Sequence, residues 1–421
     1  MSKNLRYFFI LHIIWSLVIT FNSLPVISVI YNINFVFALL SGFFLMKEVF
    51  YKKLYKKNHI PSFFKFITGI LLIWIFLNLF RDPVSNVKGF IRFLGGRYYV
   101  AAWFPVLFIY IGSKIQIWSS LWSFSFKLIK LFAVFSPLLI LGVLLEIVNW
   151  SFVFNLVFIV PLFILNWEEL SNKKKTYVFI CVVSMIILAL ISSSRAETLR
   201  ILIYFPFLYL LTISKSRRKS RFFGIKIFFL ISFILSGAVF VYNGGLKNIG
   251  NETIRSNISE FEGQGFENTR EKYVYPDFFL DMEKDMFFGR GLNGTTYSYV
   301  FEDVMANVDE STNTLEVKPG YRREVESGYL QTILKIGFFG LLLKLILAIS
   351  AIYLGFFKSN NYFIKCCAFI IIEWLFSMVP SSLPQYRVSY ILFWLCIGAC
   401  LSRETRFAKS SLMFIKNITR N

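Results

Sequence analysis

The chain has 421 residues, of which 56% are hydrophobic and only 16% are charged. Soluble domains average about 45–50% apolar and about 25% charged residues, so this composition is that of a membrane protein. It excludes a secreted disulfide scaffold, a coiled coil and a disordered chain.

The formal net charge of +21 would suit a nucleic-acid-binding protein, but the position of the charges argues against that class. Residues 243–327 hold sixteen acidic and nine basic residues, for a net charge of −7, and the remainder of the chain carries +28. Most of that excess lies in short clusters between apolar runs, as the orientation of a membrane protein requires. We therefore expect no nucleic-acid partner.

The apolar runs predict an all-α polytopic integral membrane protein, because a spanning helix needs about 20 mostly apolar residues. About twelve runs qualify. In chain order they lie near residues 5–22, 26–46, 63–80, 98–113, 128–147, 151–166, 177–193, 199–213, 223–242, 337–357, 362–380 and 387–402. The first run continues into the second without a small-residue cleavage site, so we interpret it as a retained span and not as a signal peptide.

The basic loops predict the orientation of these spans. With the N-terminus in the cytoplasm, every connection from an even to an odd span is basic, and the acidic segment falls outside. Both termini are then cytoplasmic and the large loop is periplasmic. We divide the chain into residues 1–242 with spans one to nine, an extracytoplasmic loop at 243–336, and residues 337–421 with spans ten to twelve and a basic tail.

The large loop predicts short amphipathic helices. One is expected over residues 269–286, where apolar side chains recur near a helical period, with Pro276 in its first turns or at a kink. All five cysteines lie in apolar runs, and neither His12 nor His59 has a metal-ligand spacing. We therefore expect neither a disulfide framework, nor a metal site, nor a cofactor.

Arginines on the predicted outer side are the informative charges, because positive charge there runs against the positive-inside rule. They include Arg92, Arg97, Arg195, Arg270, Arg290 and Arg387. Any one of them could extend to outer-leaflet headgroups. As a set drawn from separate loops, they favour a shared anion site, since guanidinium groups bind phosphate through two hydrogen bonds and stay charged.

The end of the loop carries Glu326 and Tyr329 at the start of a further helix. These residues could be an interfacial helix with a tyrosine anchor, or a carboxylate that stabilises a helix N-terminus. A carboxylate opposite an arginine cluster could also act as a general base for a hydroxyl group. Spacing alone does not choose between these interpretations.

Three segments in this order resemble bacterial O-antigen polymerases and O-antigen ligases. They are SSSRAETLRILIYFPFLYLL, then NTREKYVYPDFFLDMEKDMFFGRGLNGTTY with its Gly289-x-Gly291, and then ESGYLQTILKIGFFGLLL. The resemblance covers residues 190–345, and it extends to the first half of the chain only through topology. It implies a polytopic glycosyltransferase of the GT-C kind that acts on undecaprenyl-diphosphate-linked glycans outside the plasma membrane.

The resemblance also implies site residues. Arg195 and Arg270 match the family's two diphosphate-binding arginines, and Glu326 occupies the place where ligases and some polymerases carry a histidine. No histidine is predicted on the outer side, and this departure favours a polymerase over a ligase. We assign Glu326, Arg195 and Arg270 as catalytic residues. The expected substrate-binding residues are Arg97, Arg92, Arg290, Tyr329 and Arg387.

The expected reaction is a direct displacement with inversion that moves the growing glycan from its lipid carrier to a new lipid-linked repeat unit. Fixed guanidinium groups would stabilise the leaving diphosphate without a metal. The expected partners are the undecaprenyl-diphosphate-linked oligosaccharide, membrane lipid and a chain-length regulator protein, in the bacterial inner membrane. The alternatives are an O-antigen ligase that attaches glycan to the lipid A core, and a flippase or transporter.

Overall fold

The structure is a computed structural model in which part of the chain is described. The described residues are 2–20, 34–56, 58–78, 80–81, 99–144, 160–167, 170–191, 275–292, 294–298, 320–322, 325, 327–379 and 388–409. All statements on the fold concern these residues.

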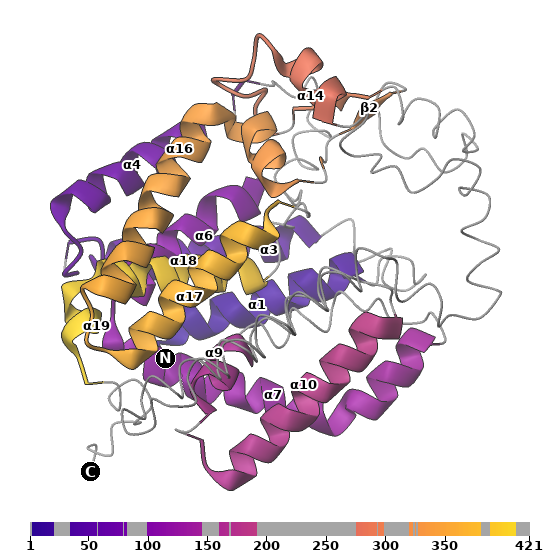
Figure 1. Cartoon of the computed structure of the whole chain (residues 1–421), viewed down its shortest axis with the longest axis vertical. Helices are drawn as coiled ribbons and strands as arrows, with labels where there is room; N and C mark the ends of the chain where they lie inside the picture. The colour runs from indigo at the N-terminus through magenta and orange to yellow at the C-terminus, as the bar shows by residue number, and fades with distance from the viewer. Residues whose placement is uncertain are drawn as a thin grey trace, which may run out of the picture.

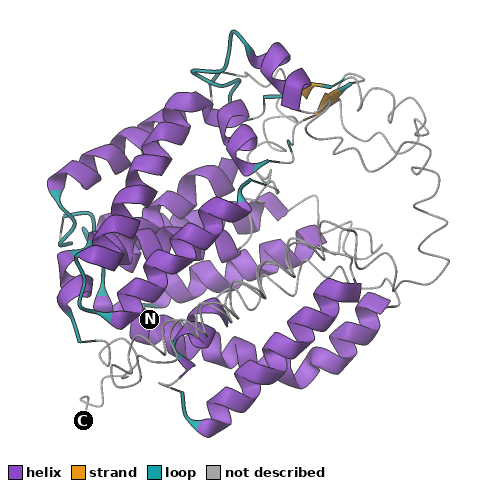
Figure 2. Cartoon of the chain, viewed as in Figure 1, coloured by secondary structure: helices purple, strands orange, loops and turns teal. Residues whose placement is uncertain are grey.

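The described part is mostly helical, as the sequence predicts (Figure 2). The first half of the chain contributes α1 (Lys3–Thr20), α3 (Asn34–Met46), the π-helix η1 (Lys47–Tyr51), α4 (Ser62–Leu77), α6 (Tyr99–Gly112), α7 (Ile115–Leu144), α9 (Val160–Leu165) and α10 (Asn172–Ile191). The second half contributes α14 (Tyr275–Met282), α16 (Gly328–Phe357), α17 (Tyr362–Ser377), α18 (Val388–Leu401) and α19 (Arg403–Phe407). A short antiparallel ladder pairs β1 (Thr296–Tyr297) with β2 (Tyr321–Arg322).

Helices occupy the predicted spans wherever the structure describes those residues. The predicted spans at 63–80, 98–113 and 362–380, for example, are α4, α6 and α17. Among the described residues, two helices are long and apolar enough to cross a membrane, namely Ile115–Gly142 within α7 and Gly328–Phe357, which is α16. The predicted spans at 199–213 and 223–242 lie outside the described residues, so the number twelve stays a prediction.

Large apolar side chains lie on the outer surface of several helices. On α7, Leu138 is 66% exposed and Val134 is 59% exposed, and on α4 Phe66 is 66% exposed. Soluble proteins rarely expose wide apolar surfaces because contact with water is unfavourable. A hydrocarbon environment removes that cost, so this surface agrees with a protein that lies in a membrane.

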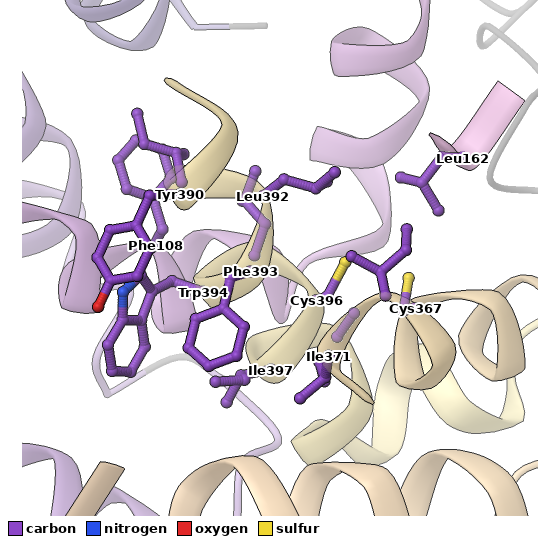
Figure 3. Packing of buried hydrophobic residues seen from close by; sticks show 14 of the residues in the cluster. Phe108, Leu162, Cys367, Ile371, Tyr390, Leu392, Phe393, Trp394, Cys396 and Ile397 are labelled. Carbon is purple, nitrogen blue, oxygen red and sulfur yellow. The ribbon is translucent and has the colours of Figure 1, made fainter. Parts of the chain in front are cut away.

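The interior is formed by α6, α16, α17 and α18, whose facing side chains are almost entirely apolar. Figure 3 shows this packing, with Phe393 and Ile397 of α18 near Ile371 of α17. Cys367 of α17 and Cys396 of α18 are buried in the same core as free thiols. Close packing of this kind holds α18 firmly against α16.

The elements from the large loop lie at one end of α16 (Figure 1). Phe278 and Met282 of α14 are buried against Leu330 and Leu334 of α16 in a second apolar cluster. The helix predicted over 269–286 is shorter than expected at its C-terminal end. It ends at Met282, and Asp285 turns back to donate its amide hydrogen to the Met282 carbonyl oxygen at 2.9 Å. Pro276 lies in the first turn, where proline is tolerated.

Candidate functional site

Two of the predicted site residues, Arg290 and Tyr329, lie in the described part of the chain. Glu326, Arg195, Arg270, Arg97, Arg92 and Arg387 lie outside it. Both described residues belong to the region where the large loop meets α16. The candidate site is therefore built from that junction.

Arg290 lies in a network of hydrogen bonds within its own loop. Its Nε donates to Asp285 Oδ2 at 2.9 Å, and its Nη1 donates to Asp281 Oδ2 at 2.6 Å and to the Thr295 carbonyl oxygen at 3.0 Å. Its Nη2 donates to the backbone and side-chain oxygens of Asp281. All five guanidinium hydrogens thus serve the loop. A substrate-binding role for Arg290 stays a prediction, and it would require the guanidinium to share these donors.

The acidic partner in this network is held ionised. Burial by itself raises the pKa of Asp281, but hydrogen bonds from Arg290, the Tyr297 amide and the Thr296 hydroxyl outweigh burial and lower it below its usual value. For Arg290, burial lowers the pKa, but hydrogen bonds to Asp281 and Asp285 raise it above its ordinary value. We call Asp281, Asp285 and Arg290 the loop ion cluster. The opposite shifts in pKa favour the charged forms of Asp281 and Arg290 at neutral pH.

The helix α16 is interrupted at Gly337, and the loop fills the interruption. Gly337 has φ 72° and ψ 176°, which is not helical. The amide of Arg290 donates to the Leu334 carbonyl oxygen at 2.8 Å, and the indole Nε1 of Trp74 in α4 donates to that of Ile336 at 2.7 Å. The carbonyl oxygens that lose their helical partners at the break thus receive hydrogen bonds from outside the helix. Unpaired backbone groups are especially costly in a membrane interior.

The second half of α16 is joined to the same loop. The amides of Phe338 and Phe339 donate to the carbonyl oxygens of Met286 and Phe287 at 2.9 and 3.2 Å. Glycine is required on both sides of this contact. A Cβ on Gly337 would lie 2.2 Å from the Phe287 carbonyl oxygen, and one on Gly289 would lie 2.5 Å from the Gly337 nitrogen. The Gly-x-Gly that carries part of the family resemblance thus lies where the loop enters the helix.

Tyr329 fixes the start of α16 to α17. Its hydroxyl donates to the Leu375 carbonyl oxygen at 2.9 Å, and its ring packs against both apolar clusters. Beside it, the Gly328 amide donates to the Met378 carbonyl oxygen at 2.8 Å. The described neighbours of Glu326, Val325 and Ser327, are both buried. A substrate-binding role for Tyr329 stays a prediction, since the structure shows a positioning contact.

A cavity lies beneath the junction, between α4, α16 and α18. Its polar lining consists of Thr332, Lys335, Lys344, Tyr390 and Trp394, and apolar side chains complete it. We call it the lysine cavity. Lys335 is 2% exposed and Lys344 is 7% exposed. Figure 3 shows Tyr390 and Trp394 near each other on α18, with ring centroids 6.0 Å apart.

Each lysine has a contact with a neutral oxygen atom. Lys335 Nζ donates to the Gly294 carbonyl oxygen at 2.7 Å, which ties the loop to α16. Lys344 Nζ lies 3.4 Å from Thr332 Oγ1 and 5.6 Å from the centroid of the Tyr390 ring, a cation–π distance. The cavity therefore has a strongly cationic lining inside an apolar helix bundle.

The comparison with protein families decides what kind of segment this is. Residues 180–345 match a family model described as O-antigen ligase. This segment is therefore similar to the O-antigen ligase family. The resemblance predicted from the sequence motifs is confirmed over it. No curated protein and no solved structure matches the chain.

This match supports a glycosyltransferase-like enzyme of the ligase or polymerase type in a membrane protein. The matched residues include Arg195, Arg270 and Glu326, as well as the loop ion cluster, the break in α16 and both cavity lysines. Trp394 and Tyr390 come from α18, beyond the matched residues. Within the described ranges, no group of three or more His, Cys, Asp or Glu side chains could hold a metal ion.

Sequence reasoning missed the lysine cavity, although one signal was present. Lys344 is a single charge in the apolar run FFGLLLKLILAIS, and ionisable residues in spanning segments are rare and usually functional. The contribution of Trp394 had no such signal, because an aromatic residue in an apolar helix is ordinary.

Proposed function

We propose that the protein is a polymerase of a surface polysaccharide that works on undecaprenyl-diphosphate-linked glycans. The growing glycan is moved from its lipid carrier to a new lipid-linked repeat unit by direct displacement with inversion. The observation that carries the proposal is the match of residues 180–345 to the O-antigen ligase family model, because the matched segment contains the three predicted catalytic residues in the expected order.

The chemistry of these residues suits the reaction. Departure of a diphosphate develops negative charge, and Arg195 and Arg270 would stabilise that charge through fixed guanidinium groups. Glu326 would accept the proton of the attacking hydroxyl group. The energy of the reaction is already stored in the sugar–diphosphate bond, so a nucleotide is not required.

A ligase that attaches the glycan to the lipid A core is the second candidate, because the matched family model is described as O-antigen ligase. Glu326 separates the two candidates in our proposal. It stands where ligases carry a histidine, and the two histidines of the chain, His12 and His59, both lie near its N-terminal end. We therefore favour the polymerase.

We further propose that the protein lies in the bacterial inner membrane with about twelve spans, both termini in the cytoplasm and the loop of residues 243–336 in the periplasm. The charge distribution supports this orientation. A chain-length regulator is the proposed protein partner. Arg97, Arg92 and Arg387 are proposed to bind substrate, together with Arg290 and Tyr329.

Deletion of the gene in its host tests the proposal, with the surface glycan displayed by electrophoresis. A polymerase predicts that single repeat units remain attached to the surface while longer chains disappear. Loss of all attached glycan would instead indicate the ligase, and accumulation of lipid-linked units inside the cell would indicate a flippase.

Variants of the three catalytic residues test the mechanism in the complemented strain. Arg195→Ala and Arg270→Ala should abolish long chains at normal membrane levels of the protein, and Arg195→Lys should keep partial activity because lysine loses the two-pronged contact. Glu326→Gln should slow transfer. Arg403→Ala, an exposed arginine of the tail, is the matched control. Wild-type chain lengths in both alanine variants would refute the diphosphate role.

A further inference from the structure

The lysine cavity holds positive charge where charge is costly. An ammonium group in apolar surroundings is strongly disfavoured unless something compensates its charge. Lys344 is buried, and within the described residues its contacts are the Thr332 hydroxyl and the Tyr390 ring. Neither contact carries a full negative charge. Lys344 therefore costs folding free energy compared with a methionine or leucine at the same position in α16.

The polar residues that line the cavity carry mainly hydrogen-bond donors. Lys344 has three ammonium hydrogens, and Trp394 adds an indole hydrogen. Trp394 is 1% exposed, and its Nε1 has no hydrogen-bond partner in the described part of the chain. The Thr332 hydroxyl donates to the Gly328 carbonyl oxygen at 2.8 Å, so its oxygen is left to receive Lys344. Among the described residues that line the cavity, none is a carboxylate.

The buried ammonium group of Lys344 and the buried indole N–H of Trp394 are independent observations, and both indicate the same kind of ligand. A buried cation requires a negative charge, and a buried indole N–H requires an acceptor. An anionic oxygen supplies both at once. Lys335, which donates to the Gly294 carbonyl oxygen, lines the same cavity. A cation as ligand would be repelled, and an apolar ligand would leave the indole hydrogen unsatisfied.

We propose that the lysine cavity binds an anionic oxygen of a phosphate group, with Lys344 and Trp394 as the groups that contact it. The residues from Phe338 to Phe357 span about 30 Å as a helix, enough for the membrane. The cavity then lies near the N-terminal end of this span, where the large loop contacts α16. The assignment of the phosphate to a polyprenyl diphosphate rests on the proposed function, whereas binding of the anion itself does not.

The test uses the full chain, purified in detergent and reconstituted in nanodiscs of zwitterionic lipid. Binding of inorganic pyrophosphate and of farnesyl diphosphate is measured by calorimetry. Lys344→Met should weaken binding of the tighter probe by about tenfold or more, since one charge-assisted contact is lost. Trp394→Phe should weaken binding by a smaller factor, and Lys344→Arg should restore most of the affinity. Lys358→Met, an exposed lysine at the other end of α16, is the control and should bind like the wild type.

The melting temperature of each unliganded variant shows whether it is folded. Equal affinities in the wild type, Lys344→Met and Trp394→Phe would overturn the proposal, and so would equal weakening in Lys358→Met. Tighter binding of farnesyl diphosphate than of pyrophosphate supports the lipid-linked source, and the reverse order supports a site for the free anion. If Arg195→Ala makes normal polymer while Lys344→Met still loses binding, the proposed function fails and the anion site stands.

Discussion

The loop ion cluster and the lysine cavity are two sets of buried or half-buried cations joined to the same broken helix, and they are compensated differently. Arg290 has two carboxylates and two backbone oxygens around its guanidinium. Lys344 has a hydroxyl group and an aromatic face. The first set has its counter-charges within the loop, whereas none of the described residues that line the second is a carboxylate.

This difference separates a structural cation from one that is available to a ligand. A guanidinium with all its donors in use stabilises its loop and has little left for a substrate. A buried ammonium group without a carboxylate partner lowers the stability of the fold until an anion binds to it. The same helix thus carries one charge that supports its fold and another that, in our proposal, serves binding.

Replacement of Gly337 should have the largest effect, because both sets depend on the break in α16. In Gly337→Val, the side chain meets the Phe287 carbonyl oxygen and requires an unfavourable φ. We expect a loss of more than about 3 kcal/mol in the free energy of unfolding, measured by thermal unfolding in detergent. Gly69→Ala in α4 is the control, where a Cβ meets nothing within 4 Å and stability should not fall. A normal melting temperature in Gly337→Val would contradict the importance of the break.

Substitution of one cation in each set compares how much the loop ion cluster and the lysine cavity contribute to the unfolding free energy. Arg290→Met leaves Asp281 and Asp285 without their partner, at side-chain exposures of 21% and 39%. We expect a loss of about 2 kcal/mol, because a partly buried charge is left unpaired. Lys344→Met should leave the unfolding free energy unchanged or raise it. Equal destabilisation by the two variants would remove the distinction between the sets.

The Tyr329 hydroxyl tests how firmly the start of α16 is held to α17. Tyr329→Phe removes the hydrogen bond to Leu375 and should cost about 1 kcal/mol of unfolding free energy. Tyr353→Phe, at a half-exposed tyrosine of the same helix, should cost almost nothing. A change in glycan length without a change in stability in Tyr329→Phe would favour the predicted substrate contact instead.

The pH dependence of stability should show the smallest effect. The folded pKa of Asp281 lies below its unfolded value of about 3.9. The carboxylate therefore contributes stability above about pH 4, and this contribution is lost as the pH falls through the lowered pKa. Melting temperatures measured between pH 3 and 7 should fall at the acidic end in the wild type. Asp281→Asn should show a shallower fall, and an identical slope in the two proteins would exclude Asp281 as a source.

The sequence predicted the helices well wherever a long apolar run defined them. Length and hydropathy place α4, α6 and α17 within a few residues of their observed ends. The break at Gly337 was not predicted, because the conformation of this glycine depends on the loop segment that packs against α16 at that point. The end of α14 was misplaced for a related reason, since apolar periodicity continues past Met282 while the backbone already turns toward α16.

The candidate site was predictable only where its chemistry is local. Arg290 could be singled out as an outer charge, but its partners depend on the turn that brings Asp281 and Asp285 to it. The lysine cavity combines Ile75, Lys344 and Trp394 from helices far apart in the chain. Such a juxtaposition needs the packing of three helices, and no pattern along one segment contains it.

The indole hydrogen bond from Trp74 to the Ile336 carbonyl oxygen joins residues 262 positions apart. During synthesis, α4 leaves the ribosome long before Ile336, which supplies the acceptor oxygen, has been added to the chain. The hydrogen bond at the break in α16 can therefore form only after most of the polypeptide has been synthesised and inserted. This contact between α4 and α16 is therefore a late event of assembly, and a chain truncated before residue 336 would lack the acceptor for the Trp74 indole.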